Sequence, residues 1–462
     1  MSARIYRLAW FLISSFVVLM LYLGYFVAVK APELEAHPLN PRGALWEKKV
    51  LRGGILDRNG EILAETRLGH RTYPLGAAAA HVVGYISQNH GRAGIEAAAN
   101  AWLAGRVGQE GIWNRLRTLL SRAGRGYDVV LTLDAFLQEK AAGLLRGRRG
   151  AIVVMEVESG AVLAMVSTPS FSPNQVDQDW GALEANPEAP LLNRALSGLY
   201  PPGSVAKLFF GAVALSQNPS LADQPIYCPG YAIQKGRRLS CPRAHGRITL
   251  KEAIEHSCNM AFATLTNQIG FQKFKQAAPI YGFNRAPDFE LPVAPSRFPE
   301  EASTAEVSEL AIGQGRLLMT PFHVTLLTAA IARKGRSVDP YIVWGVRNEQ
   351  GRGIRLPRDR QDSQLFPERV ANFLAEAMAA AVNTGTAKRA GLPRIAIAGK
   401  TGTAENPHGS PHAWFTGFAP AYAPRVAVTV LVENAGSGGE AAAPLAAKLF
   451  YWALDRVERV EW

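Results

Sequence analysis

The stretch "GAIVVMEVESGAVLAMVS", residues 150–167, carries the clearest information about the fold. Two runs of β-branched and apolar residues flank a short polar Glu-Ser-Gly sequence, a pattern that predicts two strands joined by a tight turn. "AWFTGFAP", from residue 413, and "RVAVTVLVEN", from residue 425, predict two more strands near the C-terminus, and an apolar-faced helix is expected over residues 442–457. Because a helix-rich middle separates the two pairs of strands, we expect an α/β layer structure whose first and last strands share one sheet.

Two further signals precede this stretch. "RGGILDRNGEILAET", from residue 52, predicts a hairpin, because Asn59-Gly60 is a strong tight-turn pair between two apolar runs. A β-branched strand is expected over residues 129–133, and Asp134 is placed to cap the amphipathic helix that follows.

An uncharged, strongly apolar segment lies near the N-terminus, over Leu8–Val29. Its roughly 22 residues are enough to cross a hydrocarbon core about 30 Å thick. Arg4 and Arg7 precede the segment, so the positive-inside rule predicts a cytoplasmic N-terminus and an extracytoplasmic remainder. A cleaved signal peptide is the alternative, although its apolar region would be shorter and would end in small residues.

These signals divide the 462 residues into three parts. Residues 1–30 are expected to form a cytoplasmic tail and a transmembrane anchor, and residues 126–462 one large domain. Residues 31–125 mix short turns with helical pieces and show no sustained periodicity, so we interpret them as a small extracytoplasmic stalk module.

The charge of the chain narrows the choice of partners. A formal net charge of +12 suits an anionic neighbour such as a membrane surface. The sequence contains no Lys/Arg cluster and no interleaving of basic with aromatic residues, so scattered solvated charge is expected rather than nucleic-acid binding. We predict no cofactor.

The stretch "YPPGSVAKLFF", residues 200–210, brings a serine and a lysine together in an unusual setting. A Pro-Pro-Gly turn leads into Ser204, and Lys207 follows one helical turn later, directly before an apolar run. Side chains at i and i+3 of a helix share one face. Burial would lower the lysine pKa, and the neutral amine could then take the serine proton. Alone the pattern is weak, since a snorkelling surface lysine explains it more simply.

A second candidate motif is "IEHSCNMAF", which contains Ser257 and Asn259 within an amphipathic segment. A hydroxyl and an amide two residues apart could relay a proton and bind a substrate amide. Capping or turn roles are the alternative, because both residue types often bond to nearby backbone.

The third candidate is "IAIAGKTGTAE", in which a β-branched approach leads to Lys400, Thr401, Gly402 and Thr403. Alternate side chains of a strand share a face, so a twist or bend is needed to bring the lysine and a threonine hydroxyl to one carboxylate. The glycine allows the backbone to approach a ligand closely. A plain strand end is the alternative, and "NTGTAK", from Asn383, shows that Thr-Gly-Thr also occurs here without the lysine.

Three cysteines lie outside the membrane by this topology. Cys228 and Cys241 flank a loop-like stretch and could form a disulfide in an oxidising compartment, with free thiols as the alternative. Cys258, inside the second motif, is expected to pack inward. A metal site that includes His245 matches no zinc spacing template well, so no metal is predicted.

The three motifs occur in the order Ser-x-x-Lys, Ser-x-Asn, Lys-Thr-Gly, the known signature of penicillin-binding proteins and class A β-lactamases. The chain resembles a class B penicillin-binding protein, a membrane-anchored D,D-transpeptidase that cross-links peptidoglycan. The resemblance also includes "RGGILDRNGEILA", "LNRALSGLYPPGSVAK" and "AIGQGRLLMTPFHV", and it covers most of the chain from about residue 50. It implies a transpeptidase/serine β-lactamase-like fold, a mainly antiparallel sheet packed between helices.

The resemblance also implies a role for each motif residue in the chemistry. Ser204 would attack the D-Ala–D-Ala carbonyl of a stem peptide, with Lys207 as the base. Ser257 would pass the proton toward the leaving D-alanine. An amine from a second stem peptide would then resolve the acyl-enzyme, and β-lactams would acylate the same serine.

Substrate binding would fall to the other motif residues. Asn259 would hold the peptide amide of the substrate, and the strand from Lys400 through Thr401 and Gly402 to Thr403 would bind its terminal carboxylate. The backbone N–H groups of Ser204 and Thr403 would form an oxyanion hole.

The implied function is cell-wall synthesis during division or elongation, inhibited by β-lactams, with the catalytic domain outside the cell membrane. A SEDS-type membrane glycosyltransferase is the expected partner, besides the stem peptides and the membrane. A β-lactamase or β-lactam sensor is one alternative, although the gap between Ser257 and Lys400 looks longer than in compact β-lactamases. A non-catalytic scaffold for a membrane glycan polymerase is the other. The stalk looks short beside the family's larger pedestals.

Overall fold

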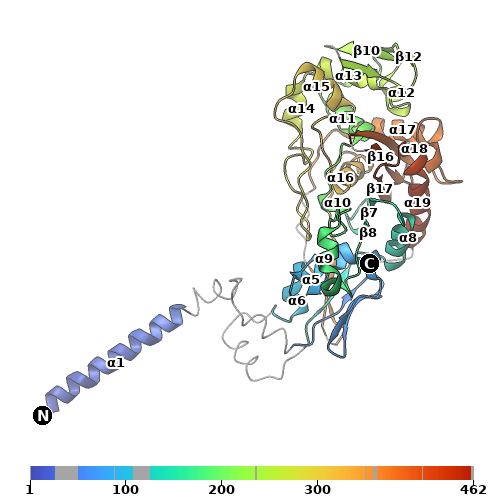
Figure 1. Ribbon diagram of the computed structural model, residues 1–462. Coiled ribbons are helices and arrows are strands. Elements are labelled where there is room, and N and C mark those ends of the chain that lie inside the picture. Colours follow the sequence, from blue (N-terminus) through green and yellow to red (C-terminus); the bar gives the residue numbers. More distant parts are fainter. Residues whose placement is uncertain are drawn as a thin grey trace. The chain divides into compact units, whose positions relative to one another are not determined.

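The computed structural model describes residues 2–26, 50–87, 89–107, 125–234, 237–348, 350–356, 362–407 and 409–458 (Figure 1). The chain divides into two compact units, Met1–Gly53 with Ala101–Tyr127, and Gly54–Asn100 with Asp128–Trp462. The second unit contains all three sequence motifs. The predicted stalk is shared between the units, with residues 54–100 in the second, and the predicted boundary at residue 125 stays a prediction.

The apolar N-terminal segment forms one helix, α1 (Ser2–Tyr25). Ala3–Tyr25 has a mean hydropathy of 2.0 in its most apolar window, and that window buries no surface against the rest of the chain. By length and composition α1 can therefore cross a membrane. The remainder of the predicted anchor and the following linker, residues 27–49, lie outside the described residues, as do residues 108–124 of the predicted stalk.

The predicted hairpin from residue 52 is confirmed as β1 (Ile55–Leu56) and β2 (Ile62–Arg67), an antiparallel pair. Its turn is fixed by Asp57, whose Oδ1 accepts the backbone N–H groups of Asn59 at 2.7 Å and Glu61 at 2.8 Å. The hairpin belongs to a six-stranded sheet in the order β14-β13-β6-β1-β2-β3. The other strands are β3 (His70–Thr72), β6 (Asp128–Leu131), β13 (Val343–Arg347) and β14 (Gly353–Arg355).

The four strands predicted at the two ends of the large domain lie in one five-stranded antiparallel sheet, ordered β15-β16-β17-β7-β8. The predicted strands are β7 (Gly150–Glu156), β8 (Val162–Thr168), β16 (Gly409–Ala419) and β17 (Val426–Val432). The third motif forms the edge strand, β15 (Ala398–Asn406), paired with β16 so that Lys400 lies opposite Thr416. The predicted arrangement, with first and last strands in one sheet, is confirmed.

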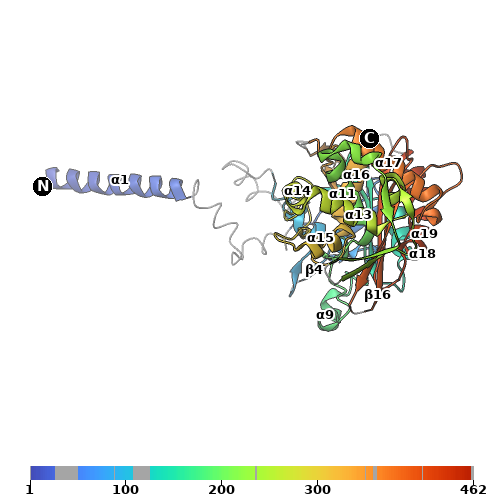
Figure 2. The ribbon, with the colours of Figure 1, turned by 90° about the horizontal axis from the view of Figure 1, so that it is seen from above.

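Helices cover both faces of this sheet (Figure 2). On one face, Val428 and Val430 join a hydrophobic cluster with Phe450 of the C-terminal helix α19 (Ala443–Glu458) and with residues of α8 (Ala135–Leu144). On the other face, Thr429 accepts a hydrogen bond at 2.9 Å from Thr325 of α16 (Pro321–Ala332). The alternation of faces along β17 is the period of two expected for a strand covered on both sides. Asp134 caps α8 as predicted, accepting the N–H of Leu137 at 2.9 Å.

The remaining elements connect and extend these layers. Besides α16, the helices between β8 and β15 are α9 (Val176–Ala185), α10 (Arg194–Ser197), α11 (Lys207–Gln217), α12 (Leu250–Glu255), α13 (Asn259–Ile269), α14 (Phe271–Ala277), α15 (Thr304–Ala311) and α17 (Glu368–Asn383). The helix α18 (Gly438–Ala441) follows β17. Short helices are α4 (Ala80–Val83), α5 (Gly94–Ala98), α6 (Asn100–Leu103), η2 (Gly76–Ala78), η3 (Gly203–Ala206), η4 (Pro219–Ala222) and η5 (Lys388–Ala390).

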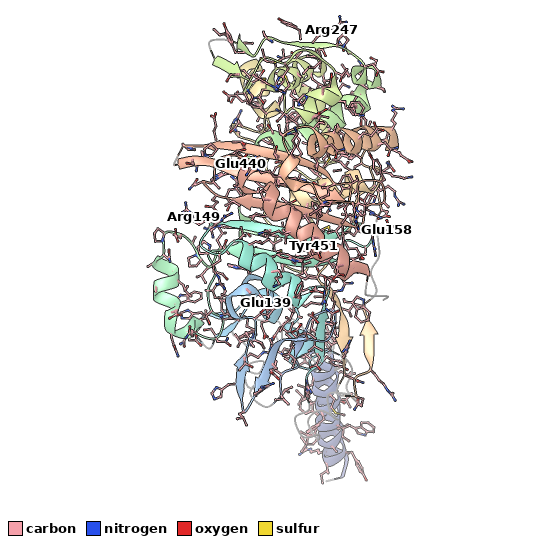
Figure 3. All side chains as sticks on the ribbon, turned by 90° about the vertical axis from the view of Figure 1, so that its right-hand side faces the viewer. Glu139, Arg149, Glu158, Arg247, Glu440 and Tyr451 are labelled. Carbon is pink, nitrogen blue, oxygen red and sulfur yellow. The ribbon has the colours of Figure 1, made fainter. Side chains whose placement is uncertain are left out.

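Three small strand pairs complete the described elements. They are β4 (Ile86–Ser87) with β5 (Gly91–Arg92), β9 (Ile226–Cys228) with β12 (Gly246–Ile248), and β10 (Tyr231–Gln234) with β11 (Arg237–Ser240). Figure 3 shows Arg247 of β12 at one end of the second unit, away from Glu139 on α8. The β9–β12 region therefore forms a separate lobe next to the helices that carry the second motif.

Candidate active site

Ser204 lies in η3, directly before the buried helix α11. Gly203 has a φ of +55°, which favours glycine, and a Cβ there would lie 2.6 Å from the carbonyl oxygen of Thr403. From the other side, a Cβ on Gly402 would lie 2.8 Å from the carbonyl oxygen of Pro202. Two glycines thus let the turn before the serine pack directly against the third motif.

Lys207 begins α11 and is fully buried. Its Nζ donates to Asn259 Oδ1 and to the carbonyl oxygen of Ser257, both at 2.7 Å, and lies 3.2 Å from Ser257 Oγ. The ring of Phe262 is 5.6 Å from Nζ. Burial lowers the pKa of Lys207 to about 7, because the charged form loses its water. A substantial neutral fraction at physiological pH makes this amine a competent base.

Ser257 and Asn259 lie at the junction of α12 and α13, rather than inside one amphipathic segment. Ser257 has a φ of +58°, an uncommon backbone conformation for a serine. Cys258 caps α13 by accepting the N–H of Ala261 at its sulfur, at 3.4 Å. The sharp change of chain direction between two helices presents the Ser257 hydroxyl to both lysines.

Lys400, on the edge strand β15, is the second fully buried lysine. Its Nζ donates to Ser257 Oγ and to the carbonyl oxygen of Thr401, each at 3.0 Å. Burial, and then the nearby Lys207, lower the pKa of Lys400 well below its usual value. The Ser257 hydroxyl therefore lies between two amines whose pKa values are both lowered by burial, an arrangement suited to passing a proton.

The structure brings Lys207, Ser257, Asn259 and Lys400 into direct contact. Among the described residues the Ser204 hydroxyl makes no hydrogen bond, although it lies one helical turn before Lys207. Catalytic hydrogen bonds are often absent before substrate binds, so this geometry is compatible with a nucleophile.

The remaining predicted binding residues are Asn259, at the start of α13, and Thr401 and Thr403 on β15. The Asn259 amide is occupied by protein groups, since Nδ2 donates to the Ser240 carbonyl at 2.7 Å. Thr401 is only 6% exposed and donates to Thr386 Oγ1 at 3.0 Å. Thr403 is exposed, and its Oγ1 accepts the backbone N–H of Gly438 at 3.4 Å. Thr403 is thus the threonine of this strand that is most open to a ligand.

Sequence reasoning missed the residues whose hydrogen bonds fix the segment that leads into Ser204. Trp414 Nε1 donates to the carbonyl oxygen of Pro201 at 3.0 Å. The Tyr200 hydroxyl donates to Glu433 Oε1 at 2.8 Å, and Arg194 donates to the same oxygen at 2.7 Å. A tryptophan inside a predicted buried strand was the available signal, because its N–H needs a partner when buried.

The three cysteines form one cluster with His245. Their ligand atoms lie within 4.8 Å of one another. Cys241 Sγ is 3.7 Å from both Cys228 Sγ and Cys258 Sγ, and Cys228 Sγ is 3.4 Å from His245 Nδ1. All three thiols are free in the structure. The choice between a Cys228–Cys241 disulfide and free thiols stays a prediction.

These four side chains fit a metal ion, although the sequence spacing predicted none. A tetrahedral zinc ion with bonds of about 2.3 Å to sulfur holds its sulfur ligands about 3.8 Å apart. The hydrogen bond with Cys258 lowers the pKa of Cys241, which favours the thiolate that zinc requires. Cys228, Cys241, His245 and Cys258 would hold zinc in a structural role, linking the β9–β12 lobe to the segment that carries Ser257 and Asn259.

A metal assay tests this fit. Protein purified without chelator under reducing conditions is expected to contain about one zinc per chain by elemental mass spectrometry, and Cys241→Ser to lose it. Because metal binding stabilises the folded state, chelation should lower the Tm by more than about 5 °C. In a parallel preparation without reductant, a metal-free chain whose mass is lower by two hydrogens would instead support the disulfide.

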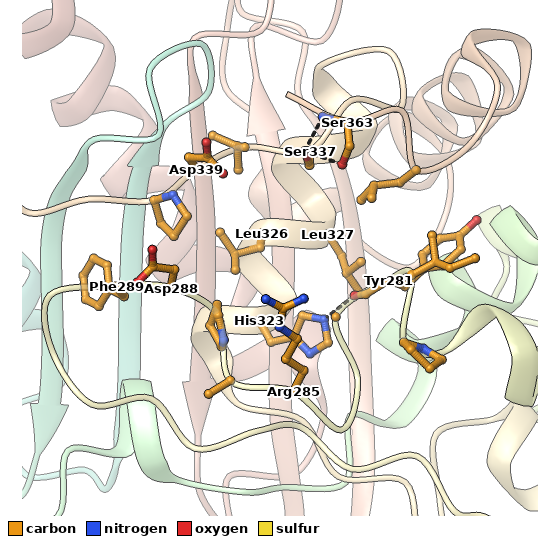
Figure 4. A pocket seen from close by; sticks show the side chains of 18 of the residues that line it. Tyr281, Arg285, Asp288, Phe289, His323, Leu326, Leu327, Ser337, Asp339 and Ser363 are labelled. Carbon is orange, nitrogen blue, oxygen red and sulfur yellow. Dashed lines mark hydrogen bonds between the residues drawn. The ribbon is translucent and has the colours of Figure 1, made fainter. Parts of the chain in front are cut away.

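A cavity of about 760 Å³ lies on another part of the second unit (Figure 4). His323 of α16 and Arg285 line it, together with Asp288 and Asp339. His323 Nε2 lies 2.7 Å from the carbonyl oxygen of Tyr281, and burial lowers the histidine pKa to about 4. No residue of the three motifs lines this cavity, so it is separate from the candidate active site.

Comparisons with known proteins agree with this geometry. Residues 150–451 match the family model described as the penicillin binding protein transpeptidase domain, and residues 52–129 match the penicillin binding protein A dimerisation domain. The chain is 33% identical to peptidoglycan D,D-transpeptidase PbpA of Mycolicibacterium smegmatis, over 90% of this chain and 91% of the relative. It is 31% identical to peptidoglycan D,D-transpeptidase MrdA of Acinetobacter baumannii, over 84% of this chain and 66% of that protein.

Solved structures agree as well. The ceftriaxone acyl-enzyme of penicillin-binding protein A from M. tuberculosis superposes with a TM-score of 0.82 at 30% identity, covering 88% of this chain and 99% of that one. The D,D-transpeptidase domain of a peptidoglycan glycosyltransferase from Eggerthella lenta gives a TM-score of 0.79 at 31% identity, covering 89% and 100%.

Proposed function

Because the chain belongs to the penicillin-binding protein transpeptidase family, we propose that Ser204 is the nucleophile with which it cross-links peptidoglycan stem peptides. The chain is a serine-type peptidoglycan D,D-transpeptidase, and β-lactams acylate it. One observation carries the assignment of residues: the Ser257 hydroxyl lies within 3.2 Å of Lys207 Nζ and 3.0 Å of Lys400 Nζ, next to the Ser204 helix.

Acylation begins when neutral Lys207 takes the Ser204 proton as Oγ attacks the carbonyl carbon of the penultimate D-alanine. The backbone N–H groups of Ser204 and Thr403 stabilise the oxyanion, which is supported by the close approach of the two segments at Gly203. The proton passes through Ser257 to the nitrogen of the leaving D-alanine, and an acyl-enzyme remains. The amine of a second stem peptide attacks this ester by the reverse proton path.

Binding of the donor peptide uses the edge strand. Lys400 supplies a hydrogen-bonding amine, and Thr401 and the exposed Thr403 supply hydroxyls, to the terminal carboxylate. Asn259 exchanges its present contact with Ser240 for the substrate's peptide amide. Since an edge strand has free backbone groups on one side, β15 can also pair with an extended peptide.

Mapping the acylated residue tests the function directly. After treatment with benzylpenicillin, the intact chain is expected to gain the mass of one drug molecule and to keep it for many minutes, because a transpeptidase excludes water as the second nucleophile. Fragmentation should place the adduct on the peptide that contains Ser204. Rapid loss of the adduct would favour a β-lactamase, and an adduct elsewhere would contradict the assignment of the nucleophile.

We further propose a single-pass topology in which α1 crosses the cell membrane and the catalytic domain lies outside the cytoplasm. Arg4 and Arg7 before the apolar helix support this orientation. Protease added to intact spheroplasts should digest the catalytic domain, and full protection would contradict the topology.

A SEDS-type membrane glycosyltransferase is the proposed partner. The apolar anchor and the module that matches a penicillin-binding protein dimerisation domain support it. Co-purification of the full chain with such an enzyme from crosslinked membranes is the measurement, and failure to recover any such enzyme counts against the proposal.

A further inference from the structure

A second Thr-Gly-Thr sequence, residues 384–386, ends helix α17 and lies beside the third motif. The backbone N–H groups of Thr384 and Gly385 both donate to the carbonyl oxygen of Ala380, at 2.9 and 3.2 Å, which closes the helix. This second Thr-Gly-Thr lacks the lysine of the third motif, and the proposed mechanism gives it no role. Its contacts nevertheless connect the end of α12, which leads into Ser257, with the edge strand β15.

The turn is fixed first to the end of α12, the helix that leads into Ser257. The Thr384 hydroxyl donates to Glu255 Oε1 at 2.5 Å, and the backbone N–H of Thr386 donates to the Glu255 carbonyl oxygen at 3.3 Å. Gly385 packs so closely on the same carbonyl that any Cβ would collide with it. These contacts hold the turn against the helix that positions the second motif.

The turn then contacts the edge strand through Thr386. Its Oγ1 lies 3.0 Å from Thr401 Oγ1 and 3.5 Å from the Glu255 carbonyl oxygen. In the structure Thr401 donates to Thr386. When Thr401 turns its proton toward a carboxylate, its oxygen can accept the single hydroxyl proton of Thr386, and Thr386 stays bound to Glu255 through its backbone N–H. Among the described residues, Thr386 Oγ1 is the hydrogen-bond partner of the nearly buried Thr401 hydroxyl, so its contact sets how that hydroxyl is oriented.

We propose that Thr386 is a positioning residue that orients the Thr401 hydroxyl toward the terminal carboxylate of the substrate. Through Glu255, at the end of α12, it also links that hydroxyl to the segment that carries Ser257. The proposal rests on the proposed function, because it takes Thr401 as a carboxylate ligand. It gives the lysine-free Thr-Gly-Thr a specific task in substrate binding.

Acylation kinetics of the full chain in detergent test the proposal, with benzylpenicillin as the probe. Thr386→Val keeps the shape of the side chain and removes its hydroxyl. We expect the second-order acylation rate to fall about three- to tenfold, the value of one net hydrogen bond. The loss should appear in the dissociation constant of the first, non-covalent complex rather than in the rate of its conversion. Thr386→Ser restores a hydroxyl and should restore most of the rate.

A double-mutant cycle separates positioning from other effects. In a Thr401→Val background, Thr386→Val should cause no further loss, because its target hydroxyl is gone. A full additional loss would overturn the proposal, since Thr386 would then contact the ligand itself or stabilise the fold. An unchanged rate in Thr386→Val, or a Thr386→Ser chain as slow as Thr386→Val, would also overturn it.

Two further variants keep the test independent of stability. Thr384→Val removes the bond to Glu255 without touching Thr401, and it should lower Tm more than it lowers acylation. If Thr386→Val does not fold, Thr386→Ala takes its place in the same cycle. Wild-type acylation at Ser204 reports on the proposed function separately: a chain acylated there but insensitive at Thr386 refutes only this inference.

Discussion

Replacing Ser204 with alanine is expected to abolish covalent labelling of the chain by a fluorescent penicillin, while the fold persists. The variant removes the only atom proposed to attack the lactam carbonyl, and loss of a nucleophilic serine in a serine protease costs on the order of 10⁶-fold in rate. The stability cost should be small, because the Ser204 hydroxyl has no hydrogen bond to lose among the described residues. Gel fluorescence and intact mass measure the labelling, and a thermal melt measures the fold.

A matched control lies on the following helix. Ser216 of α11 donates its hydroxyl to the Ala212 carbonyl at 2.7 Å and contacts none of the motif residues, so Ser216→Ala should be labelled at the wild-type rate. Full labelling of Ser204→Ala would show that another residue attacks the drug. Loss of labelling in both variants would point to a general defect of α11 instead.

Local patterns allowed the sheet to be predicted well. The two apolar runs that became β7 and β8 and the Asp-Arg-Asn-Gly turn between β1 and β2 are decided by residues close together in sequence. Asp134 could be recognised as a cap for the same reason. The pairing of β17 with β7 is not local, and predicting it required the further rule that layered α/β folds bring the first and last strands into one sheet.

The active site could be predicted only in part. The spacing of Ser204 and Lys207 is local, and helical geometry alone places them on one face. Lys207 contacts Ser257, which is 50 residues away, and Ser257 in turn contacts Lys400. These contacts depend on long-range packing that no local sequence pattern encodes. The ordered set of motifs predicted this meeting through resemblance, whereas the left-handed backbone at Ser257 had no signal in the sequence.

The thiol cluster shows the limit of spacing rules. Spacing along the chain favours Cys228 and Cys241 as a pair because they flank one loop, and it sets Cys258 apart because that residue lies in a helix-like motif. The fold places Cys258 at the cap of α13, directly against Cys241. Zinc templates assume ligands on two short, regular loops, and this centre draws on a strand, a loop and a helix cap.

Removal of Lys207 is the second change with a large expected effect. Lys207→Ala should slow acylation by about 10²- to 10⁴-fold, the usual contribution of a general base. Lys207→Arg is the more informative variant. It keeps a positive charge close to Asn259 Oδ1, yet a guanidinium stays protonated at any working pH and cannot accept the serine proton. A chain that tolerates arginine would need only the charge, and the base would have to be found elsewhere.

The pH profile of acylation decides between the two lysines. The charged or titratable groups around Lys207 are Lys400 on β15 and the thiols of Cys241 and Cys258, and burial is the main reason that its pKa lies near 7. Below that pH the ammonium form predominates and no base is available, so the wild-type rate should rise with pH through about 7 and then level off. Lys207→Arg should lose this rise together with most of the rate. If the rise persists in the arginine variant, the titrating base is a different group. Lys400 then becomes the residue to replace next, because its amine contacts the same Ser257 hydroxyl.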